Sequence, residues 1–502
     1  MERHIKADKK YICFPVKTGA ELSTAEIRNA DGKIFEFKIP SADGGFDYLA
    51  AVNIEKYRGK KLNIRGDFPL KWFDGIVLTD CPPKCTAAHP SIHFSPEYGW
   101  MNDPNGLVYS DGVYHLYFQY NPFNNKWENM SWGHASSRDL LHWEQSDTVL
   151  FPDKHGTIFS GCGIKNTGGC FGLDHDALLF FYTAAGGTND WSENKLFTQR
   201  MAYSTDGGKT LEKYDGCIVD VIGKDSRDPK VFRHDGSGAY IMVLWVRENE
   251  FAILRSNNLK DWSISQRLTL ESAFECPDLM PLETDVGMEK WIFWCADGYY
   301  FIGDFDGYEF RTDGKRYEAY GNKLAYAAQT YSGTDGRTIS VPWLRTRNSG
   351  QIYRGIMGLP REFSLKNTKD GLRLAQRPVR EYEKLKKIEL VTEAAECNFT
   401  VGEGIPFELL IENIKNITGN VYIGGEKFEI TDSEIIFGEE KVSAGGEITD
   451  IAFSVDLGII EVSANDSTVV AAFETEISND NTHVAAELDE SASIKIFDIK
   501  QH

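Results

Sequence analysis

Four strand-length segments in the middle of the chain are almost continuously apolar and rich in aromatic residues. They recur at a spacing of roughly 50–65 residues, and Gly-containing turns and more polar segments separate them. The segments are Val113–Tyr120, Ala177–Tyr182, Ala239–Trp245 and Lys290–Trp294. Such runs are typical of strands buried on both faces, and a repeat of this period is typical of β-propeller blades. We therefore predict a five-bladed β-propeller over residues 86–375, with these segments as its inner strands and the last blade at about 320–365.

Alternating apolar and polar residues flank the predicted propeller on both sides. Residues 1–85 contain short alternating segments such as Lys33–Ile39, which predict a small N-terminal β domain of unknown role. Residues 376–394 are charged and predict a linker, whereas residues 395–502 alternate again with frequent turns, as in a β-sandwich. The sequence thus predicts an all-β chain in which a small β domain, a propeller and a sandwich follow one another.

Composition and charge exclude several classes of partner. The formal net charge is −21, from 54 basic and 75 acidic residues, and no long Lys/Arg run is present, which argues against binding to nucleic acid or anionic membranes. No apolar run reaches the roughly 18 residues that a membrane span needs, and the first ten residues lack the apolar core of a signal peptide. Nine scattered cysteines do not resemble a disulfide framework. We expect a cytoplasmic protein with reduced thiols, and its oligomeric state stays open.

One group of cysteines and histidines has the residue types of a zinc site. Cys81, Cys85, His89 and His93 recur every four residues, but zinc sites of this type place about 12 residues between the Cys pair and the His pair. Three prolines also prevent the single helix that would align the four side chains. We therefore predict no metal and no cofactor.

Three carboxylates lie in unusual local settings. Asp103 belongs to the segment Trp-Met-Asn-Asp-Pro-Asn-Gly at 100–106, where Asp-Pro and Asn-Gly predict a rigid turn. Asp228 lies in Arg-Asp-Pro at 227–229, and Glu275 lies between Phe274 and Cys-Pro at 276–277. Residues that begin the innermost strands of a propeller converge on its axis, so these three side chains are expected to meet in one funnel.

Three carboxylates in one pocket suit retaining cleavage of a glycosidic bond, which needs an ionised nucleophile and a protonated acid. We expect Asp103 to be the ionised nucleophile, with the Asn102 and Asn105 amides as hydrogen-bond donors. Glu275 is expected to be the acid, because apolar neighbours and nearby carboxylates favour its protonated form. Asp228 is expected to stay ionised, paired with Arg227, and to hold substrate hydroxyls.

These motifs resemble the three signature motifs of glycoside hydrolase family 32, which comprises invertases, inulinases, levanases and related β-fructosidases. Their order matches, shorter matches such as Tyr-Ala-Ala-Gln-Thr at 326–330 accompany them, and the resemblance covers roughly residues 88–502. The resemblance implies a retaining exo-β-fructosidase that acts on sucrose and fructo-oligosaccharides through a fructosyl-enzyme intermediate. In that mechanism Asp103 would be the nucleophile, Glu275 the acid/base and Asp228 the transition-state stabiliser. It also implies which residues contact the bound fructose: Asn102, Gln119, Trp127, Phe159, Ser160 and Arg227. The 85 residues before the propeller depart from the family pattern.

Three alternatives stay open. Five-bladed propellers with three acids include inverting arabinan- and xylan-degrading enzymes, although those lack the 100–106 pattern. A non-catalytic sugar-binding protein is the second, and an enzyme for sucrose 6-phosphate the third, with Lys126 and Lys154 as candidate phosphate ligands. Trp343 suits either the pocket rim or the core. Linkage preference, substrate length and the balance of hydrolysis against fructosyl transfer are not predicted.

Overall fold

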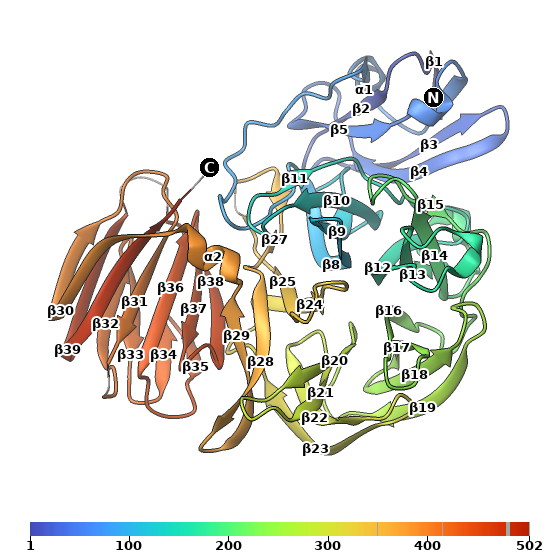
Figure 1. Cartoon of the computed structure of the whole chain (residues 1–502). Coiled ribbons are helices and arrows are strands. Elements are labelled where there is room, and N and C mark those ends of the chain that lie inside the picture. The colour runs from blue at the N-terminus through green and yellow to red at the C-terminus, as the bar shows by residue number, and fades with distance from the viewer. Residues whose placement is uncertain (349, 414, 478–481, 501–502) are drawn as a thin grey trace.

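Three β domains follow one another in the computed structural model, which describes residues 1–348, 350–413, 415–477 and 482–500. The ring of propeller blades lies in the middle, the N-terminal domain packs on one side of the ring, and the C-terminal domain lies beside the last blade (Figure 1). The predicted all-β fold, with a propeller followed by a sandwich, is confirmed. No helix within the described part of the chain has the length and apolar character that crossing a bilayer requires.

The N-terminal domain consists of a four-stranded sheet, in the order β1-β6-β3-β4, and a three-stranded sheet, in the order β5-β2-β7. Its elements are β1 (Glu2–Lys6), β2 (Tyr11–Val16), β3 (Leu22–Asn29), β4 (Gly32–Pro40), β5 (Tyr48–Asn53), η1 (Glu55–Tyr57), β6 (Lys61–Arg65), α1 (Leu70–Asp74) and β7 (Val77–Thr79). Strand β5 alternates between buried and half-buried positions, as expected for a strand with one face on a core.

Five antiparallel sheets form the propeller, and the first strand of each faces the axis, where β12 lies against both β8 and β16. The first two blades contain β8 (Gly99–Ser110), β9 (Val113–Asn121), β10 (Ser131–Ser137) and β11 (Glu144–Gln145), then β12 (Thr157–Lys165), η2 (Cys170–Gly172), β13 (Leu178–Ala185), η3 (Asp190–Ser192), β14 (Thr198–Ser204) and β15 (Glu212–Lys213). The next two contain β16 (Arg227–Arg233), β17 (Tyr240–Arg247), β18 (Glu250–Ser256) and β19 (Ser263–Thr269), then β20 (Asp278–Glu283), β21 (Glu289–Trp294), β22 (Tyr299–Phe305) and β23 (Phe310–Glu318). The fifth contains β24 (Ala325–Thr330), β25 (Ile339–Leu344), β27 (Ile356–Met357), β28 (Arg361–Thr368) and β29 (Gly371–Pro378), and β26 (Tyr353–Arg354) pairs with β8 to join the fifth blade to the first.

The aromatic segments predicted as inner strands are the second strands of their blades, one strand away from the axis. Strands β9, β13, β17 and β21 each pair with an axis strand on one side and an outer strand on the other. Strand β13 is buried at every position, because neighbouring blades cover both of its faces.

The 100–106 segment lies within strand β8 and does not form a turn. Its pairing with β9 shifts between Met101 and Pro104 and again between Asn105 and Val108, which places two bulges in the segment. A bulge inserts extra residues, bends the strand and re-aims side chains, and Pro and Gly suit it for the same reasons that they suit turns. The axis strands β12, β16 and β24 carry register shifts at the same end. Glycine is required at 161, because a Cβ there would collide with the carbonyl oxygen of Phe181.

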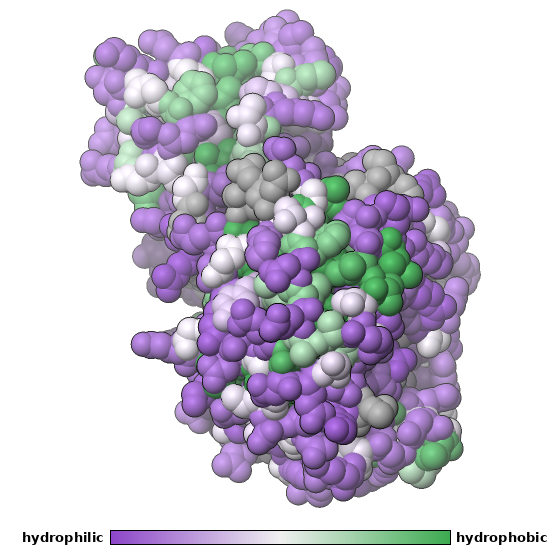
Figure 2. Space-filling view, turned by 90° about the vertical axis from the view of Figure 1, so that its left-hand side faces the viewer, coloured by the Kyte–Doolittle hydropathy of each residue, from purple (hydrophilic) through white to green (hydrophobic). Residues whose placement is uncertain are grey.

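The C-terminal domain is one ten-stranded sheet that folds over its own apolar core. Its strands are β30 (Lys386–Thr400), β31 (Phe407–Glu412), β32 (Gly419–Ile423), β33 (Glu426–Ile430), β34 (Glu434–Phe437), β35 (Glu440–Ser443), β36 (Asp450–Asp456), β37 (Ile459–Ala464), β38 (Val469–Glu474) and β39 (His483–Ile499). Strand β39 pairs with β32 through its first half and with β31 through its second half, so it passes from one layer to the other. Figure 2 views the molecule from the side of the C-terminal domain, where the N-terminal domain forms an upper lobe and most residues of the visible face are hydrophilic.

The predicted linker at 376–394 is wrong, because nearly all of it belongs to regular elements. Residues 376–378 complete β29, helix α2 (Arg380–Leu385) follows, and β30 begins at Lys386. Strand β30 pairs only with β39 and exposes much of its length, so its charged residues occur in a strand with a solvated face.

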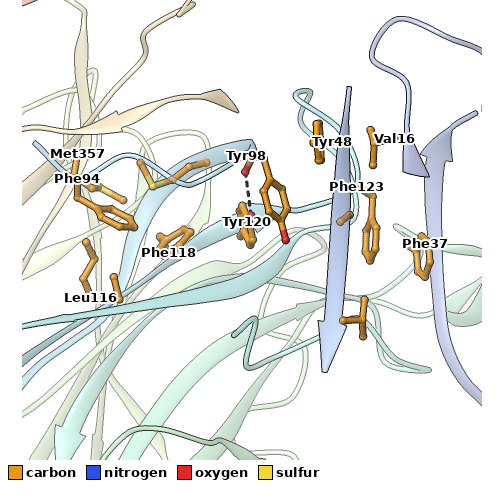
Figure 3. Close-up of a cluster of buried hydrophobic side chains, with 14 of the residues drawn as sticks. Val16, Phe37, Tyr48, Phe94, Tyr98, Leu116, Phe118, Tyr120, Phe123 and Met357 are labelled. Atoms are coloured by element: carbon orange, nitrogen blue, oxygen red, sulfur yellow. Dashed lines mark hydrogen bonds between the residues drawn. The ribbon is translucent and has the colours of Figure 1, made fainter. Parts of the chain in front are cut away.

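A continuous apolar cluster joins the N-terminal domain to the first blade. Phe37 of β4 stacks on Phe123, which follows β9, with ring centroids 3.7 Å apart and an interplanar angle of 5°. The cluster continues through Tyr98 and Tyr120 to Met357 of the fifth blade (Figure 3). The Tyr120 hydroxyl donates to the carbonyl oxygen of Tyr98 at 3.0 Å. The two domains therefore share one core.

A buried ion cluster joins the propeller to the sandwich. His93 lies between Asp456 and Glu461, with its Nδ1 3.0 Å from Asp456 Oδ2 and its Nε2 3.1 Å from Glu461 Oε1. Arg361 donates to the other oxygen of Glu461 at 2.5 Å. Burial opposes the charged form of His93, but Asp456 and Glu461 outweigh it and raise the pKa of His93 to about 9.

Replacing His93 with Gln should reduce the pH dependence of stability. Because the folded pKa of His93 is raised, its charged form contributes stability that is complete below the unfolded value of about 6.5 and is lost as pH rises through 9. Between pH 6.5 and about 9, the free energy of unfolding of the wild type should therefore fall by up to about 1.4 kcal/mol per pH unit more than that of the variant. Chemical denaturation of both proteins between these pH values measures the difference. Parallel stability curves would contradict the assignment.

Candidate active site

The three predicted carboxylates lie at one end of the propeller axis. Asp103 lies in the first bulge of β8, Asp228 begins β16, and Glu275 precedes β20. Cys276 connects them, because its Sγ lies 3.7 Å from Asp103 Oδ2 and 3.5 Å from Asp228 Oδ2. The expectation that later blades bring Asp228 and Glu275 beside Asp103 therefore agrees with the geometry.

Besides the Cys276 thiol, two neighbouring side chains donate hydrogen bonds to Asp103. Ser160 Oγ donates to its Oδ2 at 2.6 Å, and Asn102 Nδ2 donates to its Oδ1 at 3.1 Å. Asn105 was expected to be a second amide donor, but its Oδ1 instead accepts from the backbone N–H of Gly161 at 3.0 Å. Burial raises the pKa of Asp103 and the charge of Glu275 adds to this, whereas the Ser160 and Asn102 bonds oppose it.

Asp228 is the most buried of the three, with a side chain that is 4% exposed. The backbone N–H of Cys276 donates to its Oδ2 at 3.1 Å, and its own N–H donates to Thr183 Oγ1 at 3.1 Å. Burial raises the pKa of Asp228 to about 7; Arg227 opposes the shift, while Glu275 and Asp103 add to it. Burial and the two neighbouring carboxylates thus act against the predicted ionised state of Asp228, and Arg227 acts for it.

Glu275 is held by a cation and a phenol. Arg227 donates to Glu275 Oε2 through Nη2 at 2.7 Å and Nε at 3.1 Å, and Tyr326 Oη donates to Oε1 at 2.7 Å. The Arg227 Nε is farther from Asp228, at 3.7 Å from Oδ2. The expected pairing of Arg227 with Asp228 is therefore weaker than the pairing of Arg227 with Glu275. Arg227 therefore reaches from β16 to the segment that precedes β20 in the next blade.

The backbone is strained at the same residues. Asp228, Glu275 and Cys276 have φ angles of 64°, 29° and 43°, which is the left-handed region that non-glycine residues rarely adopt. Such conformations cost about 1–3 kcal/mol each and cluster at functional sites. In this protein the left-handed φ angles direct the carboxylates of Asp228 and Glu275 toward the propeller axis.

The residues expected to contact substrate occupy the same end of the propeller. Gln119 is buried opposite the first bulge of β8 and donates to the Ile158 carbonyl at 2.9 Å. Trp127 is 53% exposed and meets Phe159 edge-on, with centroids 5.9 Å apart. Asn102 accepts from Trp100 Nε1 at 2.8 Å. Their placement agrees with a lining role, and packing alone does not account for the exposure of Trp127.

Metal ligation is not supported by the arrangement of the candidate ligands. His93 is committed to Asp456 and Glu461, and His89 stacks on Tyr353 with centroids 4.8 Å apart. Within the described ranges, no group of three or more His, Cys, Asp or Glu side chains is arranged to hold a metal ion.

The sequence over residues 93–378, more than half of the chain, matches the model of the glycosyl hydrolases family 32 N-terminal domain. The chain belongs to glycosyl hydrolase family 32. This family 32 chain is 35% identical to a levanase from Bacillus subtilis over 59% of its own length, but it spans only 48% of that relative. A solved exo-inulinase from Aspergillus awamori has a TM-score of 0.71 and 26% identity, covering 82% of this chain and 98% of that one.

The N-terminal domain also has a structural counterpart. A family 32 structure from Bifidobacterium adolescentis covers 99% of this chain and 99% of its own, with a TM-score of 0.67 and 17% identity. At that identity the likeness concerns the fold alone.

Several site residues were not singled out from the sequence. Tyr326 lies in a segment that matches the family pattern, but nothing local indicates that its hydroxyl reaches Glu275. The Trp245 ring stacks under the Arg227 guanidinium at 3.9 Å, and Thr183 bonds to Asp228 from the neighbouring blade. Trp343, which by sequence suits either the rim or the core, is partly buried and lies edge-on to Trp100 and Tyr326, with ring centroids 6.0 and 6.3 Å away. Tyr326 and Thr183 reach Glu275 and Asp228 from other blades, and Trp245 and Trp343 are cross-strand partners of Arg227 and Tyr326, so these contacts join residues far apart in the sequence and no local signal marks them.

Proposed function

We propose that this protein is a retaining exo-β-fructosidase that removes terminal β-fructofuranosyl units from sucrose and fructo-oligosaccharides. The observation that carries the proposal is the convergence of Asp103, Asp228 and Glu275 around Cys276, with Arg227 and Tyr326 on Glu275. The levanase and exo-inulinase relatives support the substrate class.

In the first step, Asp103 attacks the anomeric carbon of the terminal fructosyl unit. A bond forms between a carboxylate oxygen and that carbon while the glycosidic bond breaks, and Glu275 gives its proton to the departing oxygen. In the second step, a water gives a proton to Glu275 and attacks the same carbon, which releases fructose and the Asp103 carboxylate. Two inversions at one carbon give net retention.

The surrounding residues would divide between holding the carboxylates and holding the sugar. Ser160 and Asn102 hydrogen-bond to Asp103 and would also contact fructose hydroxyls. Gln119, Phe159, Trp127 and Arg227 would complete the pocket, with Trp127 offering an exposed aromatic face for a sugar ring. Asp228 would bind hydroxyls beside the cationic transition state once substrate displaces solvent.

Sucrose 6-phosphate is the second candidate substrate. Lys126 and Lys154 are both exposed, in the connections after β9 and before β12 at the site end of the first two blades. A phosphate on the substrate would gain from these charges without a change in the chemistry of the axis.

Product analysis tests the function directly. Purified protein should release fructose from sucrose, inulin-type oligosaccharides and levan, with the anomer first formed having the β configuration of the substrate. Preference for sucrose 6-phosphate would favour the second candidate. Inverted products would indicate an arabinan-type mechanism, and no release from any of these substrates would indicate a sugar-binding protein.

Two variants separate the proposed catalytic roles. Asp103→Ala and Glu275→Ala should each lower kcat by about 1,000-fold or more, because nucleophile and proton donor are both essential to the two steps. With an activated leaving group, azide should rescue Glu275→Ala and give a fructosyl azide of retained configuration. Any azide product of Asp103→Ala should be inverted. The same stereochemistry from both variants would contradict the roles.

The activity should depend on the proton that the cluster retains. Catalysis needs one proton among the three carboxylates, and burial together with Glu275 and Asp103 raises the pKa of Asp228 to about 7 against the opposing effect of Arg227. Above that value kcat/KM should fall about tenfold per pH unit. A profile of kcat/KM against pH for sucrose measures this, and a constant value between about pH 6 and 9 would contradict it.

A further inference from the structure

One strand of the N-terminal domain contacts two loops at the site end of the propeller. Strands within a blade alternate in direction, so the β9–β10 and β13–β14 connections lie at the same end as Asp103. The first connection, residues 122–130, carries Trp127, and the second, residues 186–197, carries Trp191 and Phe197. Both loops pack on the same ring, because Trp127 and Phe197 lie edge-on to Phe159, with centroids 5.9 and 5.5 Å away.

Strand β4 fixes the first loop through its backbone. The N–H of Lys38 donates to Asn129 Oδ1, and Asn129 Nδ2 donates to the Lys38 carbonyl, both at 2.8 Å. The Lys38 side chain bonds to Glu128 at 2.7 Å, and Phe37 stacks on Phe123 at the start of the loop. Both ends of the loop that presents Trp127 are therefore attached to β4.

The same strand fixes the second loop through a buried carboxylate. Glu36 Oε1 accepts from the backbone N–H of Trp191 at 3.1 Å, and its other oxygen bonds to Lys33. The Lys33 ammonium also lies over the Trp191 ring, 5.2 Å from its centroid. The Glu36 side chain is only 6% exposed, so this pair is shielded from water and sensitive to the loss of either partner.

Two large apolar side chains stay exposed where these loops face solvent, Trp127 at 53% and Leu196 at 50%. The loops connect second and third strands, so they lie farther from the axis than the carboxylates do. A terminal fructose that reaches Asp103 would place the following sugars beside them.

We propose that β4 positions the outer wall of the site, and that its Glu36–Trp191 and Lys38–Asn129 contacts set the binding of sugars beyond the terminal fructose. This inference rests on the proposed fructosidase activity. Glu36 and Lys38 are positioning residues: they act through the two loops and leave the carboxylates on the axis unchanged. The N-terminal domain then selects for substrate length.

The test compares KM and kcat of Glu36→Ala and wild type on sucrose and on fructose-terminated tri- and tetrasaccharides. Losing the Trp191 bond should raise KM for the longer substrates about 2- to 10-fold, and that for sucrose less, with kcat nearly unchanged. Glu36→Gln keeps an acceptor oxygen for the Trp191 N–H and should restore KM. Glu55→Ala is the matched control, because Glu55 pairs with Arg58 inside the domain and away from the loops.

Lys38→Glu provides a second variant on a more exposed pair, in case Glu36→Ala does not fold. This substitution places a second carboxylate beside Glu128, and the repulsion should raise KM in the same length-dependent way. Unchanged KM on every substrate would overturn the proposal. An equal loss of kcat on all substrates with lower thermal stability would also overturn it, by showing a purely structural role. If wild type released no fructose, the proposed function would fail before the variants were compared.

Discussion

Three carboxylates share one end of a propeller axis, and much of the site follows from holding their charges together. Like charges this close, with little water to screen them, raise each other's pKa values and disfavour the ionised forms. The protein offsets this with donors from all five blades: Ser160 and Asn102 on Asp103, the Cys276 N–H on Asp228, and Arg227 with Tyr326 on Glu275. Each of these donors favours the ionised form of the carboxylate that it contacts, which opposes the effect of burial and of the neighbouring charges.

The geometry that brings these groups together comes from irregular strands. Bulges in β8, β12, β16 and β24 lie at the residues that line the pocket. A regular strand would point alternate side chains between blades, whereas a bulge turns consecutive residues such as Asn102 and Asp103 to the same end. The left-handed φ angles at Asp228 and Glu275 have the same effect. The local strain is tolerated because each bulged strand pairs with an apolar second strand that neighbouring blades bury.

The sequence predicted the parts of the molecule that have local signals. The aromatic repeat gave the five blades, and three short motifs gave the three carboxylates. The errors concern long-range partners: Asn105 bonds to Gly161, and Arg227 pairs mainly with Glu275 on the next blade. Strand β30 was taken for a linker because an edge strand with a solvated face has the composition of a charged connection. The bulged axis strands resembled turns, since Pro, Gly and Asn serve both purposes.

Chemistry and selectivity are carried by different parts of this fold. The carboxylates and their donors lie on the axis strands and the segments that lead into them, all within the propeller and bonded across blades. Among the described residues, the N-terminal domain contributes no hydrogen bond to Asp103, Asp228 or Glu275, and its strand β4 bonds instead to the loops around Trp127 and Trp191. Under the proposed function, a change in that domain would alter the binding of the outer sugars without altering the pKa values of the three carboxylates. The shared core around Phe37 and Phe123 makes this influence possible, because a loosely tethered domain could not hold a loop in place.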